Sequence, residues 1–444
     1  MKSEKQKNII IVGFGFEGRC AFSYFKKKYP KARIAIADQN IINNPPKGVE
    51  TFFGKNYLEK IGEFDLIIKS PGVPAHLPEF KKAIKNKVEI TTATNLFFSQ
   101  FRDQIIGVTA TKGKSTTATL IYKILKQAGK EVYLLGNIGD ANPYKFLNKK
   151  PNKNLFFVYE LSSYQLADLN QSPRVAVWLN IFPDHLPYHG SFAKYQKAKA
   201  NISLFQNHQD WFIYNSSFQY LKNLVKKSQA QKVDYLNKCV IKNNAIFYGA
   251  EKIVDIKKIK LLGEHNFKNI MAVICAVKIL GIKNTDIEKA ISSFKGLEHR
   301  LEFVKKVKGI EFYDDAISTT PESTMAGMEV FGDRLGTMIL GGQDRGYNFK
   351  NLAKKIFELK IKNIILFPDS GKTIWQEIEK VYQKNKTSLP KKLETSNMKE
   401  AVQFAYKNTT PGKVCLLSTA SPSYSIFKNF KEKGDLFKKE VKKL

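Results

Sequence analysis

The chain has 444 residues, and its 73 lysine and arginine residues against 40 acidic residues give a formal net charge of +33. This length predicts two or three domains rather than one core, and a hydrophobic fraction of 43% argues against overall disorder. The charge raises nucleic-acid binding as an option, but the lysines are spread along the whole chain, which is more typical of solvated surfaces than of one binding patch.

Targeting and redox features favour a cytoplasmic protein. No apolar run approaches the roughly 18 residues that a membrane span requires. The polar start leads into a short apolar run without a small-residue cleavage site, so we expect a first strand there and no signal peptide. The cysteines lie far apart, which predicts reduced thiols rather than disulfides or a zinc site. They are Cys20, Cys239, Cys275 and Cys415.

Short apolar runs alternate with helical patterns in three successive series along the chain. The first series has runs at residues 8–12, 33–37 and 66–68, and the second at 104–109, 131–135, 155–159 and 175–180. The third has runs at 310–313, 337–340, 363–367 and 414–417. Repeated alternation of this kind predicts the α/β class with mainly parallel sheets. We place the domains at residues 1–100, 101–296 and 297–444.

A glycine-rich turn follows the first run. The segment Gly13-Phe-Gly15-Phe-Glu-Gly18 opens a helical pattern, and Asp38 comes twenty residues after Gly18. This is the spacing of the dinucleotide fingerprint, in which glycines let a diphosphate approach the backbone and an acid binds ribose. It predicts a nucleotide diphosphate site, with NAD as the usual ligand of the motif, while a purely structural tight turn stays open.

A second glycine-rich loop follows the run at 104–109. Gly107-Val-Thr-Ala-Thr-Lys-Gly-Lys-Ser-Thr116 leads into a helical pattern that ends near Gly129. Backbone N–H groups and Lys114 would hold phosphates, and a hydroxyl would ligate Mg²⁺. Gly107 stands one residue too far out for the strict P-loop spacing, so a Gly-Lys turn capped by Ser or Thr remains the alternative.

Two further strand ends carry candidate metal ligands. Glu160 follows the run at 155–159, and His185 follows the run at 175–180. Ligands gather at the carboxyl ends of strands in open α/β sheets, so both side chains could converge on the phosphate loop. Histidine is an unusual Mg²⁺ ligand, and a capping role is the alternative for His185. Nothing local distinguishes Lys199 in so lysine-rich a chain.

Taken in order, these segments resemble the Mur ligase family over essentially the whole chain. Thr109-Ala-Thr-Lys-Gly-Lys-Ser-Thr116 is similar to the family loop TGTNGKST, and Gly136-Asn-Ile-Gly139 to GNIG. Further matches are Glu160-Leu-Ser-Ser163, Asn180-Ile-Phe-Pro-Asp-His-Leu186, Tyr195-Gln-Lys-Ala-Lys199, Gly263-Glu-His-Asn266 with Asn269, and Gly296-Leu-Glu-His-Arg-Leu-Glu302. The C-terminal part adds Asp314-Asp315, Gly341-Gly342 and Ser423 through Phe430.

The resemblance implies a role for each of these positions. ATP would contact Thr111, Lys112, Gly113, Lys114, Ser115, Thr116, Asn266, Asn269, Arg300 and Asp315. Two Mg²⁺ ions would be held by Ser115, Glu160, His185 and a Lys199 carbamylated by CO2. The catalytic set would be Lys114, Glu160, His185, Lys199, Arg300 and Asp315. Gly13, Gly15, Asp38 and Ser70 would lie along the UDP, and Asn137 and Ser162 would face the muramoyl-alanine portion of the substrate. The remaining substrate contacts would be Thr319, Arg345, Ser423 and Phe430.

The implied fold has a Rossmann-like N-terminal domain for a UDP group, a central P-loop-type ATPase domain and a Rossmann-like C-terminal domain for the amino acid. The implied reaction joins glutamate to UDP-N-acetylmuramoyl-L-alanine through an acyl phosphate. The D isomer is the expected form of glutamate. This step belongs to cytoplasmic peptidoglycan synthesis, on which cell shape and division depend. The implied enzyme acts as a monomer, without nucleic acid.

Several positions depart from the family pattern. Ala110 and Lys112 replace a glycine and an asparagine of the loop, and Pro187 stands in the family's DHLDRHG segment. Ile317 replaces the lysine of the D-glutamate ligases' NDSKATN, and Arg345 stands where another lysine is expected. Arginine clamps a carboxylate with two N–H groups where lysine offers a point charge, so amino-acid recognition could differ. A branch that adds L-glutamate therefore stays open.

Three other functions remain open. A folylpolyglutamate-synthase-like ligase would need a pterin site instead of the fingerprint around Gly13. An NAD-dependent dehydrogenase would explain the fingerprint, but neither Lys114 nor Lys199. A nucleic-acid-stimulated ATPase would explain the charge and the phosphate loop, and would show strongly salt-dependent polymer binding.

Overall fold

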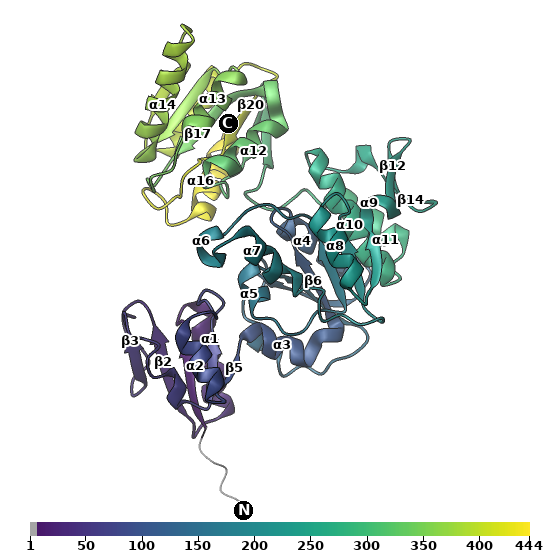
Figure 1. Ribbon diagram of the computed structural model, residues 1–444. Coiled ribbons are helices and arrows are strands. Elements are labelled where there is room, and N and C mark those ends of the chain that lie inside the picture. Colours follow the sequence, from purple (N-terminus) through teal and green to yellow (C-terminus); the bar gives the residue numbers. More distant parts are fainter. Residues whose placement is uncertain (1–6) are drawn as a thin grey trace, which may run out of the picture. The chain divides into compact units, whose positions relative to one another are not determined.

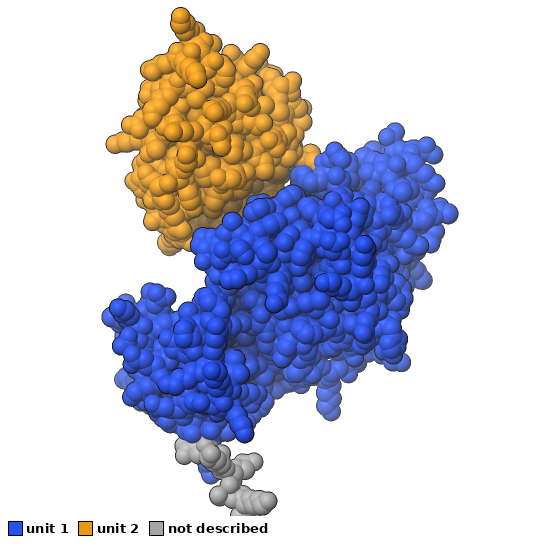
Figure 2. Space-filling model, viewed as in Figure 1, with its two compact units in different colours: residues 1–259, 264–294 blue, residues 260–263, 295–444 orange. Residues whose placement is uncertain are grey.

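The computed structural model describes residues 7–444. Residues 1–6 lie outside the described part, and they belong to the polar start for which we predicted no signal peptide. Contacts within the chain define two compact units (Figure 2). The first runs to Ile259 and includes Glu264–Phe294; the second comprises Lys260–Gly263 and Lys295–Leu444.

The first sheet is built from five parallel strands in the order β3-β2-β1-β4-β5. The strands are β1 (Asn8–Val12), β2 (Arg33–Asp38), β3 (Glu50–Phe53), β4 (Leu66–Lys69) and β5 (Glu89–Thr91). The helices are α1 (Phe16–Lys28), α2 (Pro78–Lys85) and α3 (Ala93–Phe101), the first two seen beside the sheet in Figure 1. Ile9 and Ile11 pack in one core, and Ile10 and Val12 in another, because successive strand residues point to opposite faces.

The second sheet has six parallel strands in the order β11-β10-β9-β6-β8-β7. They are β6 (Ile105–Thr109), β7 (Glu131–Gly136), β8 (Leu155–Glu160), β9 (Val175–Trp178), β10 (Trp211–Tyr214) and β11 (Gln231–Asp234). Its helices are α4 (Lys114–Gln127), α5 (Ser163–Ala167), α6 (Leu186–His189), α7 (Phe192–Ala200), α8 (Gln219–Lys227), α9 (Tyr235–Lys238), α10 (Glu264–Ile279) and α11 (Asn284–Ser293). A small antiparallel sheet follows with β12 (Cys239–Lys242), β13 (Ala245–Tyr248) and β14 (Glu251–Asp255).

The second unit contains one six-stranded sheet in the order β15-β16-β20-β17-β18-β19, parallel except for β15. The strands are β15 (Glu302–Val307), β16 (Ile310–Asp314), β17 (Leu335–Gly341), β18 (Asn363–Phe367), β19 (Lys391–Glu394) and β20 (Val414–Leu417). Its helices are α12 (Pro321–Phe331), α13 (Lys350–Glu358), α14 (Ser370–Lys384), α15 (Met398–Asn408) and α16 (Phe430–Lys442). The first three of these helices cover one face and the last two the other.

Short 3-10 turns connect several of these elements: η1 (Ile61–Glu63), η2 (Arg102–Gln104), η3 (Pro143–Phe146), η4 (Ile256–Lys258) and η5 (Gly332–Arg334). In the described part of the chain, no helix is both long enough and apolar enough to cross a membrane.

The predicted α/β class is confirmed, and every apolar run taken as a strand contains one. The strands that the runs did not predict are short, polar or at sheet edges, such as β11 and β19. Edge strands bury only part of their residues, so they lack the continuous apolar run of a central parallel strand. The predicted domain boundaries at residues 100 and 296 stay predictions.

Candidate active site

The phosphate loop joins β6 to α4, the sheet's first strand to its first helix. Gly113 is the N-cap of α4 with φ of +90°, a left-handed conformation that favours glycine. An added Cβ there would lie 2.8 Å from Asn269 Oδ1. The loop backbone therefore packs against Asn269 of α10, which in turn donates a hydrogen bond to Asn266 Oδ1 over 3.1 Å. Of the two asparagines predicted to contact ATP, Asn269 lies against the loop and Asn266 lies beside Asn269.

Asn180, at the end of β9, holds the same loop in place. Its Oδ1 accepts hydrogen bonds from the backbone N–H of Thr111 (3.1 Å) and Lys112 (2.9 Å). Its Nδ2 donates to the carbonyl oxygen of Lys112 over 2.8 Å. Sequence reasoning quoted Asn180 only as part of a motif, and its position at a strand end on the central sheet is the signal that could have marked it.

Lys114 folds back over the loop. Its Nζ donates to the carbonyl oxygens of Ala110 (2.9 Å) and Thr111 (3.2 Å). Next to it, Ser115 is partly exposed and Thr116 is buried. Together with the N-terminus of α4, these groups form the arrangement of N–H donors and positive charge that binds phosphate.

Lys199 is buried in α7, with 1% of its surface exposed. Its Nζ donates to Thr109 Oγ1 and to the carbonyl oxygen of Ala110, each over 3.0 Å. Burial lowers the pKa of Lys199 well below its ordinary value, and the positive charge of Lys114 lowers it further. Burial therefore favours the neutral, nucleophilic amine of Lys199 over its ammonium form beside the phosphate loop.

The two other predicted metal ligands come from neighbouring strand ends. Glu160 closes β8 and is 3% exposed, and its charge acts on Lys199. His185 is the N-cap residue of α6, but its side chain makes no capping hydrogen bond. Burial lowers the pKa of His185; Asp184 opposes this shift, and Lys114 and Lys199 add to it. A neutral imidazole can ligate a metal.

A cavity of about 420 Å³ joins Lys114, His185 and Lys199 to Asn137 and Ser162, the residues predicted to face the muramoyl-alanine portion. Its walls are Glu17, Pro71, Gly72, Lys114, Asn137, Ser162, Ser163, Tyr164, Gln165, His185, Tyr195 and Lys199. Glu160 is not among them. Ser162 serves the fold as well, because it caps α5 in a reciprocal pair of hydrogen bonds with Gln165. The cavity can accept a substrate that reaches from the N-terminal loops to the phosphate loop.

The donor set fits Mg²⁺ on one condition. A carboxylate from Glu160 and a hydroxyl from Ser115 are oxygen ligands of the kind that Mg²⁺ prefers. The amine of Lys199 does not suit this ion, but a carbamate at the same atom would present oxygen. The residues therefore fit the metal if Lys199 is modified.

The predicted nucleotide residues of the first sheet also lie together. Asp38 Oδ2 accepts a hydrogen bond from the N–H of Phe14 over 2.7 Å, and Ser70 Oγ donates to the carbonyl oxygen of Gly13 over 2.8 Å. Gly15 is the exposed N-cap of α1. Three adjacent strand ends thus converge on the fingerprint loop, which leaves the N-terminus of α1 open to a diphosphate.

In the second unit, Asp315 ties the Arg300 loop to the sheet. Its Oδ1 accepts from the N–H of Leu301 over 3.2 Å, and its Oδ2 accepts from Ser418 Oγ over 2.8 Å. Burial raises the pKa of Asp315 to about 6, although its hydrogen bonds and Arg300 oppose the shift. The carboxylate of Asp315 follows β16, at the carboxyl edge of this sheet.

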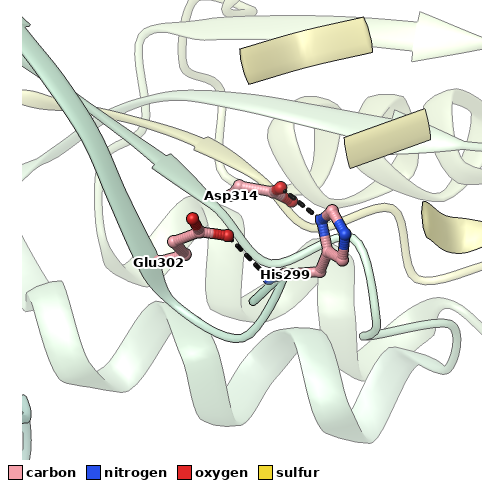
Figure 3. A group of neighbouring side chains, drawn as sticks. All are labelled: His299, Glu302 and Asp314. Carbon is pink, nitrogen blue, oxygen red and sulfur yellow. Dashed lines mark hydrogen bonds and ion pairs between the residues drawn. The ribbon is translucent and has the colours of Figure 1, made fainter. Parts of the chain in front are cut away.

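His299 clamps the other side of that loop (Figure 3). Its ring pairs with Asp314 through Nδ1 and Oδ2 at 2.7 Å, and its backbone N–H donates to Glu302 Oε2 over 2.8 Å. These three residues have ligand atoms within 4.8 Å of one another, but hydrogen bonds already occupy them. His299 and Leu301 have φ of +60° and +44°, strained values that these contacts sustain. Sequence reasoning missed this clamp.

The remaining predicted substrate residues follow the strands of the same sheet. Thr319 lies just before α12, and the exposed Arg345 follows β17 and donates to Gln343 Oε1 over 3.2 Å. Ser423 follows β20, is 3% exposed, and its Oγ has no hydrogen-bond partner within residues 7–444. Phe430 begins α16 with its ring edge-on to His299. These residues all lie on the side of the sheet where its parallel strands have their carboxyl ends, and a polar amino acid could bind there.

Comparison with known proteins identifies the family of the chain. The Mur ligase middle domain matches residues 108–277, and the N-terminal domain described as Mur ligase MurD-like matches residues 7–92. UDP-N-acetylmuramoylalanine–D-glutamate ligase from Geobacillus kaustophilus is 31% identical, over 99% of this chain and 98% of its own length. The chain belongs to the Mur ligase family.

Further comparisons support this assignment to the family. The enzyme of the same name from Oenococcus oeni is 32% identical over 99% of this chain and 97% of its own. Among solved structures, UDP-N-acetylmuramate-alanine ligase MurC from Thermotoga maritima covers 99% of this chain and all of its own, with a TM-score of 0.57. At 19% identity, this likeness shows the fold alone. The predicted resemblance and the three-domain α/β fold are confirmed.

Proposed function

We propose that this protein is an ATP-dependent ligase that joins D-glutamate to UDP-N-acetylmuramoyl-L-alanine, as a cytoplasmic monomer in peptidoglycan synthesis. The observation that carries the proposal is the cavity that joins Lys114, Lys199 and His185 to Asn137 and Ser162. Relatives about 31% identical over full length carry this activity in their names and support D-glutamate over the L isomer.

The phosphate loop would hold ATP so that its terminal phosphoryl group is transferred to the alanine carboxylate of the acceptor. Lys114 would offset the charge on the phosphoryl group. Mg²⁺ held by Ser115, Glu160 and His185 would supply Lewis-acid charge neutralisation. The amine of glutamate would then attack the acyl phosphate, and inorganic phosphate would leave from the tetrahedral intermediate.

Lys199 would complete the metal site as a carbamate. The neutral amine attacks the carbon of CO2, the nitrogen loses a proton, and an anionic carbamate forms. The low pKa of Lys199 supports this step, since an ammonium group has no lone pair for the attack. Glu160, His185 and the carbamate would then present the ligand set that Mg²⁺ needs.

Substrate-dependent turnover tests the function. Phosphate release from ATP is expected only with both UDP-N-acetylmuramoyl-L-alanine and glutamate, and D-glutamate should be ligated far faster than L-glutamate. A faster rate with L-glutamate would assign the chain to the other branch. Equal turnover without either substrate, or stimulation by DNA or RNA instead, would refute the proposal. Reduction of NAD by a hydroxy acid, or glutamylation of a folate, would point to the other open functions.

A variant tests the carbamate. Lys199→Ala should lose ligation by at least about a hundredfold, because the metal site loses an oxygen ligand. Short carboxylates such as acetate or formate should restore part of the activity, since they can place an oxygen in the vacated space. The control is Lys197→Ala on the same helix, which should keep its activity. Full activity of unrescued Lys199→Ala would rule out the carbamate role.

A further inference from the structure

Glu17 is an acidic side chain in the cavity with no role in the proposed chemistry. It stands in the first turn of α1, between Gly15 and Gly18 of the fingerprint loop. It lines the cavity that also contains Lys114 and Lys199. Its Oε1 is buried and has no hydrogen-bond partner among the described residues. Buried polar atoms in native proteins are nearly always paired, so such an atom in a cavity indicates a ligand group.

Lys69 is a cation whose charge acts on Glu17, but its hydrogen bonds and its ion pair are with other residues. Lys69 forms an ion pair with Asp168 Oδ2 at 2.7 Å and donates to the carbonyl oxygens of Val73 (2.6 Å) and Ser70 (3.3 Å). Its two hydrogen bonds and its ion pair direct the Lys69 ammonium toward these three partners. The carboxyl group of Glu17 therefore faces Lys69 without a hydrogen bond from it.

The surroundings of Glu17 favour the protonated, neutral form of its carboxyl group. Burial raises the pKa of Glu17 to about 7, Lys69 opposes this shift, and Asp168 adds to it. The other titratable groups around it are Cys20, Tyr144 and Tyr159 on packed elements. The cavity walls add Lys114, Tyr164, His185, Tyr195 and Lys199. A protonated carboxyl can both donate and accept a hydrogen bond, and it does not repel a substrate that carries a diphosphate and a carboxylate.

The cavity walls indicate which part of the substrate reaches Glu17. Pro71 and Gly72 follow Ser70 on the predicted nucleotide side, while Asn137 and Ser162 belong to the predicted muramoyl-alanine side. Glu17 shares the cavity with both sets. The sugar connects these two parts of the substrate, and it carries uncharged hydroxyl and acetamide groups.

We propose that Glu17 is a specificity-determining residue whose carboxyl group hydrogen-bonds an uncharged hydroxyl or acetamide group of the substrate's sugar. This inference rests on the proposed function, since that function supplies the sugar nucleotide. The proposed Glu17 contact is with the neutral sugar, whereas the contacts proposed above are with the diphosphate and the carboxylate of the substrate. It also gives the acidic residue of the fingerprint loop a role that a plain diphosphate site would not need.

Calorimetric binding to the full-length protein tests the contact, with UDP-N-acetylmuramoyl-L-alanine and with UDP alone. Glu17→Ala is expected to weaken binding of the sugar nucleotide roughly three- to tenfold, the effect of one lost hydrogen bond, and to leave UDP binding unchanged. Glu59→Ala, an exposed change in the same domain, should alter neither. Equal weakening for both ligands, or no weakening, would overturn the inference.

The pH dependence adds an independent measurement. In the wild type, the Kd of the sugar nucleotide should rise as the pH increases from 6 to 8.5, because Glu17 loses its proton and becomes an unfavourable anion. Glu17→Gln keeps the size and hydrogen-bonding capacity but cannot ionise, so this part of the rise should vanish. Superimposable profiles of wild type and Glu17→Gln would contradict the proposal, even if Glu17→Ala failed to fold.

Wild-type ligation separates the two claims. A wild type that does not ligate glutamate to the sugar nucleotide refutes the proposed function. An active wild type whose KM for the sugar nucleotide equals that of Glu17→Ala refutes only the role of Glu17.

Discussion

Lys433 is a buried lysine in α16, and burial disfavours its charged form in the folded state. It is 1% exposed, and its Nζ donates to Thr419 Oγ1 over 2.5 Å. Burial lowers the pKa of Lys433 to about 7, although Asp314 and Asp315 oppose the shift. The same two acidic neighbours anchor the Arg300 loop through His299 and Leu301, so Lys433 lies beside the predicted nucleotide contacts.

The shifted pKa predicts how stability depends on pH. Between pH 7 and about 10, unfolded Lys433 binds a proton that the folded state does not, so the free energy of unfolding should rise with pH, by up to roughly 1 kcal/mol per pH unit. Lys433→Met should remove this rise, while the exposed Lys431→Met should keep it. Urea unfolding of the variants at several pH values measures the slope. Parallel slopes in wild type and Lys433→Met would contradict the assignment.

Sequence motifs predicted individual residues only where the chemistry is local. The phosphate loop with Lys114 could be found because its glycine, lysine and hydroxyl residues are contiguous. Asn180 and the pair of His299 with Asp314 act through contacts between distant segments. Lys199 could be assigned only through the family resemblance, because its burial is not visible in a chain so rich in lysine.

At the element scale, Gly18 sets how closely α1 packs against the loop that precedes it. A Cβ at Gly18 would collide with the carbonyl oxygen of Gly13, whereas one at Gly15 would meet nothing within 4 Å. The third glycine of the fingerprint therefore serves helix packing, and the second serves access to the helix N-terminus.

Two alanine variants separate these roles. Gly18→Ala should destabilise the first domain by roughly 1–3 kcal/mol, because backbone must move to make room. Gly15→Ala should leave thermal stability nearly unchanged, and weaken UDP binding if the diphosphate approaches there. Calorimetric melting and UDP titration measure both effects. A Gly18→Ala protein as stable as the wild type would contradict the packing role.

The elements themselves were predictable to the extent that they are buried. Central parallel strands such as β1, β18 and β20 match their apolar runs residue for residue. The edge strand β19 was not predicted, because all of its exposed positions are polar. The hairpin of β12 and β13 was not predicted either, although CVIK and AIFY are mostly apolar, because each strand is only four residues long. Alternating or polar short strands give a weak periodic signal, while continuous apolar runs give a strong one.

For the molecule as a whole, the sequence by itself determined the α/β class, the phosphate loop and the family. Those features depend on the order of apolar runs and on contiguous motifs, which local patterns encode. The tertiary structure decided which side chains meet: Asn269 beside Gly113, Asn180 on the loop backbone, and Glu17 in the cavity with Lys199. Such contacts depend on the order of strands within each sheet and on where helices cross them, and local periodicity contains neither.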